Sequence, residues 1–481
     1  MVEPATYTVK TEVPSSYIAK FFDFIHSQYL LPQKERFSNF LRQTTSEADT
    51  LSYIVSNIQG KEILQVEAKS GNPIEVKVTP IDTAVTATEQ EEAKQDIVIA
   101  LQMFEENARK ATMFFAWREG EDIVPEAYTK PEKSFNRLFL ETQVIFFVVF
   151  IVFGTTIFIT LASIYPDSFW IAPLILIVVQ FVFVFYSNSF ISRSADWHIT
   201  PANPTIHLLQ FFLPIEEKNF TEKLTREKLV AIKKEIYQDI TAKHGQIDPI
   251  FAQSIFEKHD IHVKLENLTT KKINVYQIVK DIADRFRFPM PKIVVSNTMV
   301  PNAAASGPSP KRGLVLITTG LLVQLEEPEI VSVLGHEFGH LRGRDPLILY
   351  GLTAAEFLFR FYVLFPLLPI LFSTFLFFVY FWGVMVVIFF IAKFFEARAD
   401  LVSAMMIGQP TVLADSLEKI GFQRLLYERT PSFRVQEWIG LDPHPPIYFR
   451  VNRLEQLEPA TIKHPLLQSI RDVTSGFIAS L

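Results

Sequence analysis

The sequence contains no cysteine among its 481 residues. This absence excludes disulfides, catalysis by a thiolate and metal sites built from Cys, so any bound metal needs His, Asp or Glu ligands. The chain also lacks a long basic block, and its net charge of −6 is spread along its length. Nucleic acid is therefore not expected as a partner. The N-terminus, Met1-Val2-Glu3-Pro4, lacks the basic stretch and apolar core of a signal peptide.

Hydrophobic residues, by contrast, make up 49% of the chain and gather in two blocks. In the first block, uncharged runs separate Glu141 from Asp167 and Asp167 from Arg193. Each run is longer than the roughly 20 residues that a helix needs to cross a bilayer. A turn-like link at residues 165–168 joins them, so this block is expected to form a membrane-spanning helical hairpin.

The second hydrophobic block runs from Pro346 to Phe395. Its uncharged stretch from Phe361 to Ala392 is too long for one ordinary span, and Pro366 and Pro369 lie near its middle. These features favour a second hairpin of two helices. Periodicity leaves open one long helix with an interfacial segment. Glu356 and Arg360 lie four residues apart within the third span, so we expect them to pair with each other or to line a water-filled cavity.

Basic residues flank both hairpins, and neither link between the spans carries Lys or Arg. They are Lys130, Lys133 and Arg137 before the first span, Arg193 after the second, Arg342 and Arg344 before the third, and Lys393 and Arg398 after the fourth. The positive-inside rule therefore predicts a multi-pass protein of the cell membrane with both termini in the cytoplasm.

The pentapeptide His336-Glu337-Phe338-Gly339-His340 directly precedes the second hydrophobic block. On a helix, residues four apart share a face, so both imidazoles can reach one metal ion. Glu337 is placed to act as general base on a water molecule. By the charge rule this box lies on the cytoplasmic side, where its helix leads into the third span. An isolated H-E-x-x-H match also occurs by chance, so a third ligand is required.

Glu396 is the candidate third ligand, in Phe395-Glu396-Ala397-Arg398-Ala399-Asp400. It leaves the fourth span where His340 enters the third, so closing the hairpin brings the two together. His336, His340 and Glu396 would form a two-His, one-Glu site for one zinc ion, with a fourth position open. Asp400 lies on the same helix face and can hydrogen-bond a ligand imidazole. The sequence also permits Glu396 to be a charged cap on a membrane helix.

The soluble segments show weaker patterns. Alternating residues at 62–68 and 74–78 predict a β-hairpin, residues 111–117 a strand and residues 16–41 a helix. These N-terminal elements hold no catalytic constellation. Residues 223–244 form the clearest amphipathic stretch of a polar, mostly helical segment. Downstream, the pattern predicts a helix at 275–286, strands at 291–296 and 313–318, and a helix opened by Pro328 that contains the box.

Several segments in order resemble the HtpX-type membrane zinc metalloproteases, which are related to the CAAX prenyl proteases. They are Asn302-Ala303-Ala304-Ala305-Ser306-Gly307, Leu316-Ile317-Thr318-Thr319-Gly320-Leu321-Leu322, the box with Asp345 downstream, Glu396 to Asp400, and His444-Pro445-Pro446 with Arg450. The similarity covers about residues 274–455 and the first membrane hairpin. An ordered set of this kind is far more specific than any single motif.

The resemblance implies that His336, His340 and Glu396 bind zinc and that Glu337 activates the water. It also implies that Asn302, Ala303, Ala304 and Ala305 form an edge strand that pairs with an extended substrate. The family usually has an aromatic residue where this chain has Ala304, which puts the pocket contacts in doubt. His444 is either a catalytic group that stabilises the oxyanion, or, with Arg450, a structural tie for the C-terminal helix.

The implied fold is a mainly α membrane protein with four transmembrane helices in two hairpins, a cytoplasmic α/β zincin-like protease domain and an extra N-terminal α+β domain. The expected divisions are an accessory domain (1–135), a first hairpin (138–193), a polar helical insert (194–273), an N-terminal protease segment with the box (274–346), a second hairpin (347–395) and a C-terminal protease segment (396–481). The accessory domain and the insert have no counterpart in the shorter family members.

The resemblance implies a metalloendopeptidase that cleaves misfolded or damaged membrane proteins, with protein or peptide substrates and the lipid bilayer as partners. One alternative is a CAAX-type processing protease acting on lipidated peptides, but such enzymes have seven spans. Another is a non-catalytic membrane adaptor. Glu337 argues against an adaptor, because a purely structural zinc site needs no base.

Overall fold

A computed structural model divides the chain into two compact units. The first comprises Met1–Phe115, His207–Lys272 and Glu418–Leu426, and the second comprises Ala116–Ile206, Ile273–Leu417 and Tyr427–Leu481. The structure describes residues 3–11, 15–44, 48–57, 59–71, 73–110, 112–118, 156–157, 159–161, 163–164, 170–212, 226–243, 247–372, 375–428 and 431–481. Most of the polar insert expected at 194–273 thus groups with the N-terminal residues.

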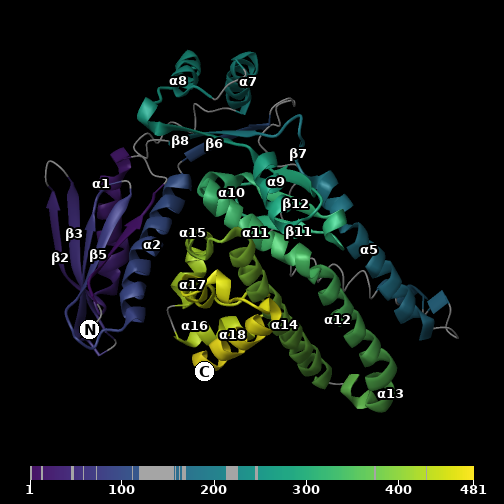
Figure 1. The fold of residues 1–481 in the computed structure, drawn as a ribbon. Helices are drawn as coiled ribbons and strands as arrows, with labels where there is room; N and C mark the ends of the chain where they lie inside the picture. The colour runs from purple at the N-terminus through teal and green to yellow at the C-terminus, as the bar shows by residue number, and fades with distance from the viewer. Residues whose placement is uncertain are drawn as a thin grey trace. The chain divides into compact units, whose positions relative to one another are not determined.

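The first unit is built around a five-stranded antiparallel sheet with strand order β1-β5-β4-β3-β2 (Figure 1). Its strands are β1 (Ala5–Val9), β2 (Phe37–Thr44), β3 (Asp49–Ser56), β4 (Glu62–Lys69) and β5 (Ile74–Pro80). Buried and exposed residues alternate along β5 because helix α2 (Ala87–Lys110) covers one face. The predicted hairpin is confirmed as the β4–β5 pair.

The predicted helix at residues 16–41 is only partly correct. Helix α1 (Ser15–Phe24) continues as a π-helical segment (Ile25–Leu30), and a 3₁₀ turn containing Pro32 ends it. Pro cannot continue a regular helix because it lacks a backbone N–H. The chain then enters β2, where Phe37 is buried against the sheet. Pairing with β3 therefore overrides the local helical pattern.

A second sheet has the order β6-β8-β9, with strands β6 (Thr112–Arg118), β8 (Ile206–Phe212) and β9 (Leu268–Ile273). The strand predicted at 111–117 is confirmed as β6. Between β8 and β9 lie helices α7 (Arg226–Lys243) and α8 (Pro249–Lys258). The Asp248 side chain caps α8 by accepting a hydrogen bond of 2.9 Å from the Ile250 N–H.

The second unit contains a four-stranded sheet with the order β11-β12-β10-β7. Its strands are β7 (Trp197–Ile199), β10 (Lys292–Ser296), β11 (Ala303–Ser306) and β12 (Leu314–Thr318). Strands β10 and β12 are parallel, whereas β11 runs antiparallel to β12 at the edge. Strand β12 is buried along its whole length. The strands predicted at 291–296 and 313–318 are therefore confirmed.

Three helices follow this sheet along the chain or pack beside it. Helix α9 (Val275–Phe286) matches its predicted position, and α10 (Thr319–Gln324) follows β12. Helix α11 (Glu327–Gly343) contains the H-E-x-x-H box, and Pro328 lies in its first turn as expected. Glu326 and Glu329 form a capping box at its start, which satisfies backbone N–H groups that a helix start leaves unpaired.

Helix α11 ends at Arg344, whose backbone is left-handed with φ of 54°. Helix α12 (Asp345–Phe359) begins at the next residue. The box helix therefore reaches the third predicted span through a turn and does not continue into it. This turn places Asp345 beside the end of α11, where it meets the box.

Within the described residues, three helical stretches are long and apolar enough to cross a membrane: Ala172–Arg193, Asp345–Leu367 and Leu376–Ile407. They correspond to helix α5 (Ala172–Ser194), to α12 with the short segments Arg360–Leu364 and α13 (Phe365–Leu367), and to α14 (Leu376–Ile407). They indicate a membrane protein. The span predicted between Glu141 and Asp167 lies largely outside the described residues.

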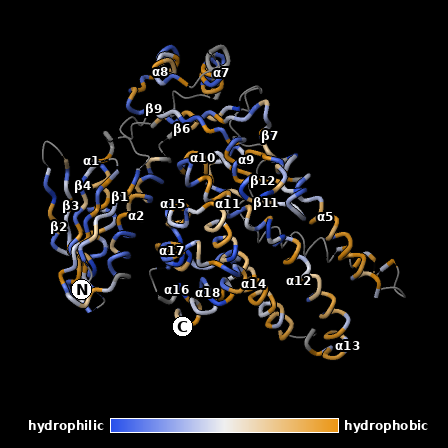
Figure 2. Tube along the Cα trace, in the orientation of Figure 1, coloured by the Kyte–Doolittle hydropathy of each residue, from blue (hydrophilic) through white to orange (hydrophobic). Residues whose placement is uncertain are grey.

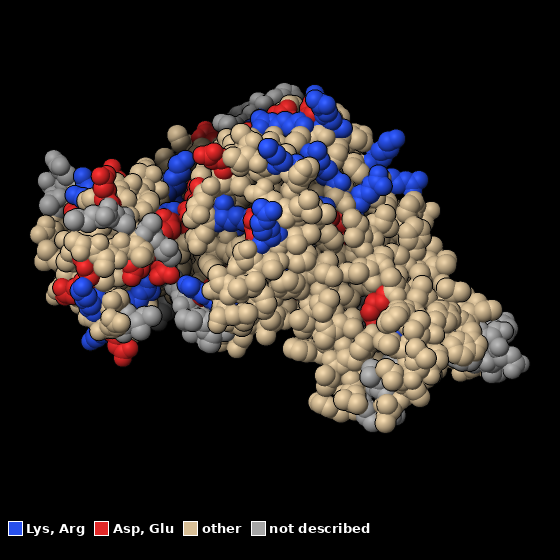
Figure 3. All heavy atoms as spheres, turned by 60° about the horizontal axis from the view of Figure 1, so that its bottom comes forward, with Lys and Arg blue, Asp and Glu red and all other residues tan. Residues whose placement is uncertain are grey.

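These helices carry an apolar surface. Figure 2 shows α5, α12, α13 and the lower end of α14 largely in the hydrophobic colour. On the face drawn in Figure 3, the lower right region carries almost no charged atoms. The second hydrophobic block forms two helices, so the alternative of one long helix is wrong. Inside it, Arg360 pairs with Glu356 at 3.0 Å, as expected, and Tyr380 donates to the same carboxylate at 2.9 Å.

Four helices follow α14 along the chain, and residues Glu418–Leu426 of the first of them group with the first unit. They are α15 (Pro410–Glu428), α16 (Pro431–Ile439), α17 (Ile447–Glu455) and α18 (Pro465–Ser480). The Glu428 carboxylate accepts hydrogen bonds of 2.8 Å from the N–H groups of Ile447 and Tyr448. An anion at a helix N-terminus is stabilising, so this contact fixes the start of α17.

Helices α11 and α14 approach each other along a row of glycines. Gly335, Gly339 and Gly343 recur every four residues, so they share one face of α11. A Cβ atom at Gly339 would lie 2.9 Å from the Cα of Ala399 and 3.0 Å from its carbonyl oxygen. A Cβ atom at Gly343 would collide with the Arg398 guanidinium. Only hydrogen fits at these positions.

We expect Gly339→Ala to lower the thermal unfolding midpoint in detergent. Alanine gains about 1 kcal/mol of helix propensity over glycine, but overpacking against backbone atoms costs typically about 1–3 kcal/mol. The matched control is Gly351→Ala in α12, where a Cβ would meet nothing within 4 Å. If Gly339→Ala melts at or above the control, the close approach of α11 and α14 is not a constraint.

Candidate metal centre

Two imidazoles and one carboxylate converge between α11 and α14. His336 and His340 lie one turn apart on α11, and their Nε2 atoms are 3.1 Å from each other. Glu396 on α14 faces both. Its Oε2 lies 3.3 Å from His336 Nε2, and its Oε1 lies 3.3 Å from His340 Nε2. The structure thus brings together the three residues that the sequence suggests as metal ligands.

The spacing of these atoms fits a tetrahedral metal. With metal–ligand bonds of about 2.0–2.1 Å, the ligand atoms of a tetrahedral zinc site lie about 3.3 Å apart. The observed separations of 3.1 and 3.3 Å agree with that edge length. Glu396 is buried, and its Oε2 has no hydrogen-bond partner among the described residues. A cation between the imidazoles would satisfy this oxygen.

Each imidazole has a carboxylate close to its other nitrogen. His336 Nδ1 lies 2.8 Å from Asp400 Oδ1, and His340 Nδ1 lies 2.8 Å from Asp345 Oδ2. A carboxylate at Nδ1 fixes the ring so that Nε2 presents its lone pair to a metal. The sequence suggested Asp400 for this position. It gave no role to Asp345, which reaches His340 only because the chain turns after α11.

Two arginines hold these carboxylates in turn. Arg450 on α17 forms a two-point contact with Asp400 at 2.9 and 2.7 Å. Arg398 on α14 donates to both oxygens of Asp345 at 2.5 and 2.6 Å. All four side chains are buried, where an unpaired charge would be costly. Arg450 thus ties the C-terminal region of the chain to the centre, as one reading of the sequence expected.

The electrostatics of the centre favour bound positive charge. Burial disfavours a charged imidazole at His336, but Asp400 and Glu396 outweigh this effect and raise its pKa to about 10. Burial also opposes charging of His340, yet Glu396 and Asp345 raise the pKa of that group. A metal ion must displace these protons to bind. The bound metal ion would then replace the positive charge of the protonated imidazoles, which the carboxylates stabilise.

Glu337 lies between the centre and the edge strand β11. Its Oε2 accepts a hydrogen bond of 2.9 Å from the Ala305 N–H. Asn302 precedes the strand and is held by Thr318, whose N–H donates to the Asn302 carbonyl at 3.0 Å. The candidate base and the predicted substrate strand are therefore neighbours, although they lie 32 residues apart in sequence.

His444 also lies at the centre. Its Nε2 is 3.7 Å from Glu396 Oε2, and its side chain is 38% exposed, so it borders the open side. Asp442 holds the other nitrogen, Nδ1, at 2.8 Å and accepts the His444 backbone N–H at 2.8 Å. The buried Lys393 ammonium donates to the Asp442 carbonyl. Sequence reasoning missed Asp442, whose only signal is its position two residues before a histidine.

We expect Asp345→Asn to weaken zinc binding about 10- to 100-fold, the usual effect of losing a carboxylate that orients a ligand histidine. The substitution removes the charge that holds His340 and leaves Arg398 buried without its partner. The control is Asp284→Asn on the exposed side of α9. Zinc affinity, measured by competition with a chromophoric chelator, should fall only in the first variant. Equal affinities would show that Asp345 does not orient the ligand.

Comparison with known proteins finds a family model that matches the part of the chain containing the centre. Residues 269–458 match the model of peptidase family M48. The chain is 43% identical over 74 residues to a protease HtpX homolog of Thermodesulfovibrio yellowstonii, which covers 15% of this chain and 26% of that protein. It is 42% identical over 81 residues to a protease HtpX homolog of Thermococcus kodakarensis, which covers 17% and 27%. The chain thus matches about a quarter of these relatives' length.

Among solved structures, the crystal structure of S. mikatae Ste24p matches 36% of this chain and 48% of its own. The two are 16% identical, and the TM-score of 0.30 is too low to establish a common fold. The family match, by contrast, contains every residue of the candidate metal centre. Residues 269–458 therefore resemble peptidase family M48, and part of the chain is similar to HtpX proteases.

Proposed function

We propose that this chain is a membrane-embedded zinc metalloendopeptidase with one zinc ion per chain. The observation that carries the proposal is the convergence of His336 Nε2, His340 Nε2 and the Glu396 carboxylate, in which a different carboxylate oxygen lies 3.3 Å from each imidazole nitrogen. Glu337 lies on the same helix beside them and supplies the base. A structural zinc site usually has four protein ligands, whereas a catalytic one keeps an open position.

The chemistry is hydrolysis of a peptide bond. Held by the three candidate ligands, zinc would supply Lewis acidity that lowers the pKa of water and so provides a nucleophile at neutral pH. Glu337 accepts a proton from the attacking water. At the same time the oxygen of the water bonds to the peptide carbonyl carbon. When the C–N bond breaks, Glu337 returns that proton to the leaving amine. His444 Nε2 borders the open side, which supports a role in donating to the negatively charged carbonyl oxygen, with Asp442 holding the ring.

Strand β11 is suited to bind an extended substrate. In an antiparallel pair, successive residues direct their N–H and C=O groups alternately toward and away from the partner strand. Asn302 faces β12 through Thr318, and the Ala305 N–H points instead to Glu337. Ala303 and Ala305 thus direct backbone groups outward, and Ala304 faces β12. A substrate strand added at this edge would be recognised through its backbone, with little demand on its side chains.

This mode of recognition supports misfolded or damaged membrane proteins as substrates, because unfolded segments expose extended backbone. The apolar helices on both sides of the centre in sequence keep it near the bilayer. We further propose that the centre faces the cytoplasm of the cell membrane. The basic residues Arg342 and Arg344, which lie between the box and the second hydrophobic block, support that orientation.

We expect Glu337→Gln to retain zinc and to lose cleavage of an unfolded, casein-like substrate by at least about 100-fold, since the amide cannot accept the proton. The measurement combines metal content with proteolysis of the purified full chain in detergent. Glu327→Gln, exposed at the start of the same helix, is the control and should cleave normally. Wild-type cleavage by a zinc-loaded Glu337→Gln variant would refute the mechanism.

We expect Ala303→Pro to lower kcat/KM for peptide cleavage at least about tenfold, because proline removes an outward N–H that would bond the substrate backbone. Pairing with β12 does not use that N–H, so zinc content should be unchanged. Ala303→Ser keeps the N–H and serves as the control. If both variants cleave with the wild-type kcat/KM, the substrate does not pair with β11.

A further inference from the structure

Helix α18 has two apolar faces. One face packs inward, where Val473 lies in a buried cluster with Ala397 of α14 and Trp438 of α16, and Phe477 packs against them. This contact accounts for the amphipathic pattern of the helix. The second apolar face has no such partner among the described residues.

The outward face forms a continuous stripe. Leu466, Leu467, Ile470 and Ile478 are all exposed, Leu467 by 65% and Ile478 by 62%. At about 100° per residue, Leu467 and Ile478 lie about 100–120° around the helix from Leu466. The inward-facing Val473 and Phe477 lie within about 20° of Leu466, so the exposed stripe borders the packed face. We call the four exposed residues of this stripe the C-terminal apolar face. A contiguous exposed surface of this kind marks an interaction site.

The contacts of this segment with α14 fix its level along the candidate span. Ile462, just before α18, packs against Leu401 and Ala404. The Phe477 ring near the other end lies 5.4 Å from that of Phe390. Helix α18 therefore runs along α14 toward the apolar N-terminal half of α14. Ile478 directly follows Phe477, which makes the contact nearest to that half.

At that level α14 itself changes character. Ile388 and Phe389 are buried at 9% and 5%, whereas Val387 is 58% exposed and Trp382 56%. The exposed stretch is the apolar surface expected to face lipid. The end of α18 thus lies beside the point at which α14 passes from protein into bilayer.

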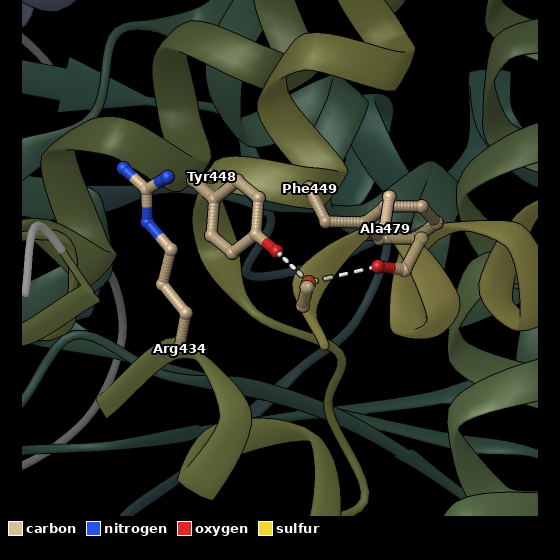
Figure 4. A pocket seen from close by; sticks show the side chains of 6 residues that line it. Arg434, Tyr448, Phe449 and Ala479 are labelled. Carbon is tan, nitrogen blue, oxygen red and sulfur yellow. Dashed lines mark hydrogen bonds between the residues drawn. The ribbon is translucent and has the colours of Figure 1, made fainter. Parts of the chain in front are cut away.

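The opposite side of α18 is fastened, so the outward face cannot turn in. The Tyr448 hydroxyl and the Ser480 Oγ lie 2.7 Å apart (Figure 4), and Trp438 Nε1 donates to the same Oγ at 2.9 Å. Tyr448 and Ser480 border a cavity of about 280 Å³, which Arg434, Phe449 and two further residues of α18 also line. The helix is thereby held by α16 and α17.

We propose that the C-terminal apolar face rests in the interfacial layer of the bilayer that α14 enters. The occupant is lipid because this face adjoins the lipid-facing surface of α14. The exposed Lys463 and Arg471 flank the stripe, as is common for helices that lie in a membrane interface. Since α17 carries Arg450, this contact would hold the metal centre at a fixed height above the membrane.

Single cysteines provide the test, because the chain contains none. Leu467→Cys and Ile478→Cys would each be labelled with bimane in the full chain, reconstituted in phosphatidylcholine nanodiscs. The controls are Ser475→Cys, an exposed position on the polar flank of α18 next to the stripe, and Val379→Cys on the exposed apolar stretch of α14. Replacing the lipid by brominated phosphatidylcholine should quench both stripe labels at least about threefold more strongly than the Ser475 label. Aqueous iodide should show the reverse order.

Two results would overturn the proposal. If iodide quenches the stripe labels as strongly as the Ser475 label and brominated lipid does not, the face lies in water. If neither quencher reaches the stripe labels while brominated lipid quenches the Val379 label, protein covers the face, for example a second copy of the chain. Both labelled positions are exposed, so their replacement should not disturb folding. Zinc content and melting temperature verify this for each variant.

Discussion

The close approach of α11 and α14 is the constraint on which the metal centre depends. Two candidate ligands lie on one helix and the third on the other, so the separation of the helices decides whether the three side chains can reach one ion. Gly339 and Gly343 remove the side chains that would hold the helices apart. Across this contact, Glu396 comes within 3.3 Å of both imidazoles. The glycines therefore allow the candidate ligands on the two helices to approach each other, in addition to allowing close packing.

Buried charge then fixes the geometry that packing makes possible. Each ligand imidazole contacts an aspartate, and each aspartate is held by an arginine from another helix. Burying such charges is costly unless every partner is present. The two chains of contacts therefore couple α11, α14 and α17. Besides Glu396, the segment from Glu396 to Asp400 thus supplies two residues that support different histidines. Asp400 contacts His336, and Arg398 holds the Asp345 that contacts His340.

The sequence was sufficient to predict His336, His340, Glu396 and Asp400, because helical periodicity places residues four apart on one face. It also predicted the β4–β5 hairpin and the strands β6, β10 and β12. The contact of Asp345 with His340 was not predicted, because it depends on the left-handed turn at Arg344, which no sequence pattern indicates. Residues 37–41 were predicted as helix because their pairing with β3 is a long-range contact that local sequence does not reveal.

X-ray absorption at the zinc edge tests the central claim most directly. The zinc-loaded full chain should show a first shell of nitrogen and oxygen at about 2.0–2.2 Å, with the multiple scattering of two imidazoles and no sulfur. Such a shell would mean that His336, His340 and Glu396 bind one ion across the α11–α14 contact. A shell with three imidazoles would require a different ligand set, for instance one that includes His444. A shell of about six oxygens would contradict a catalytic zinc site.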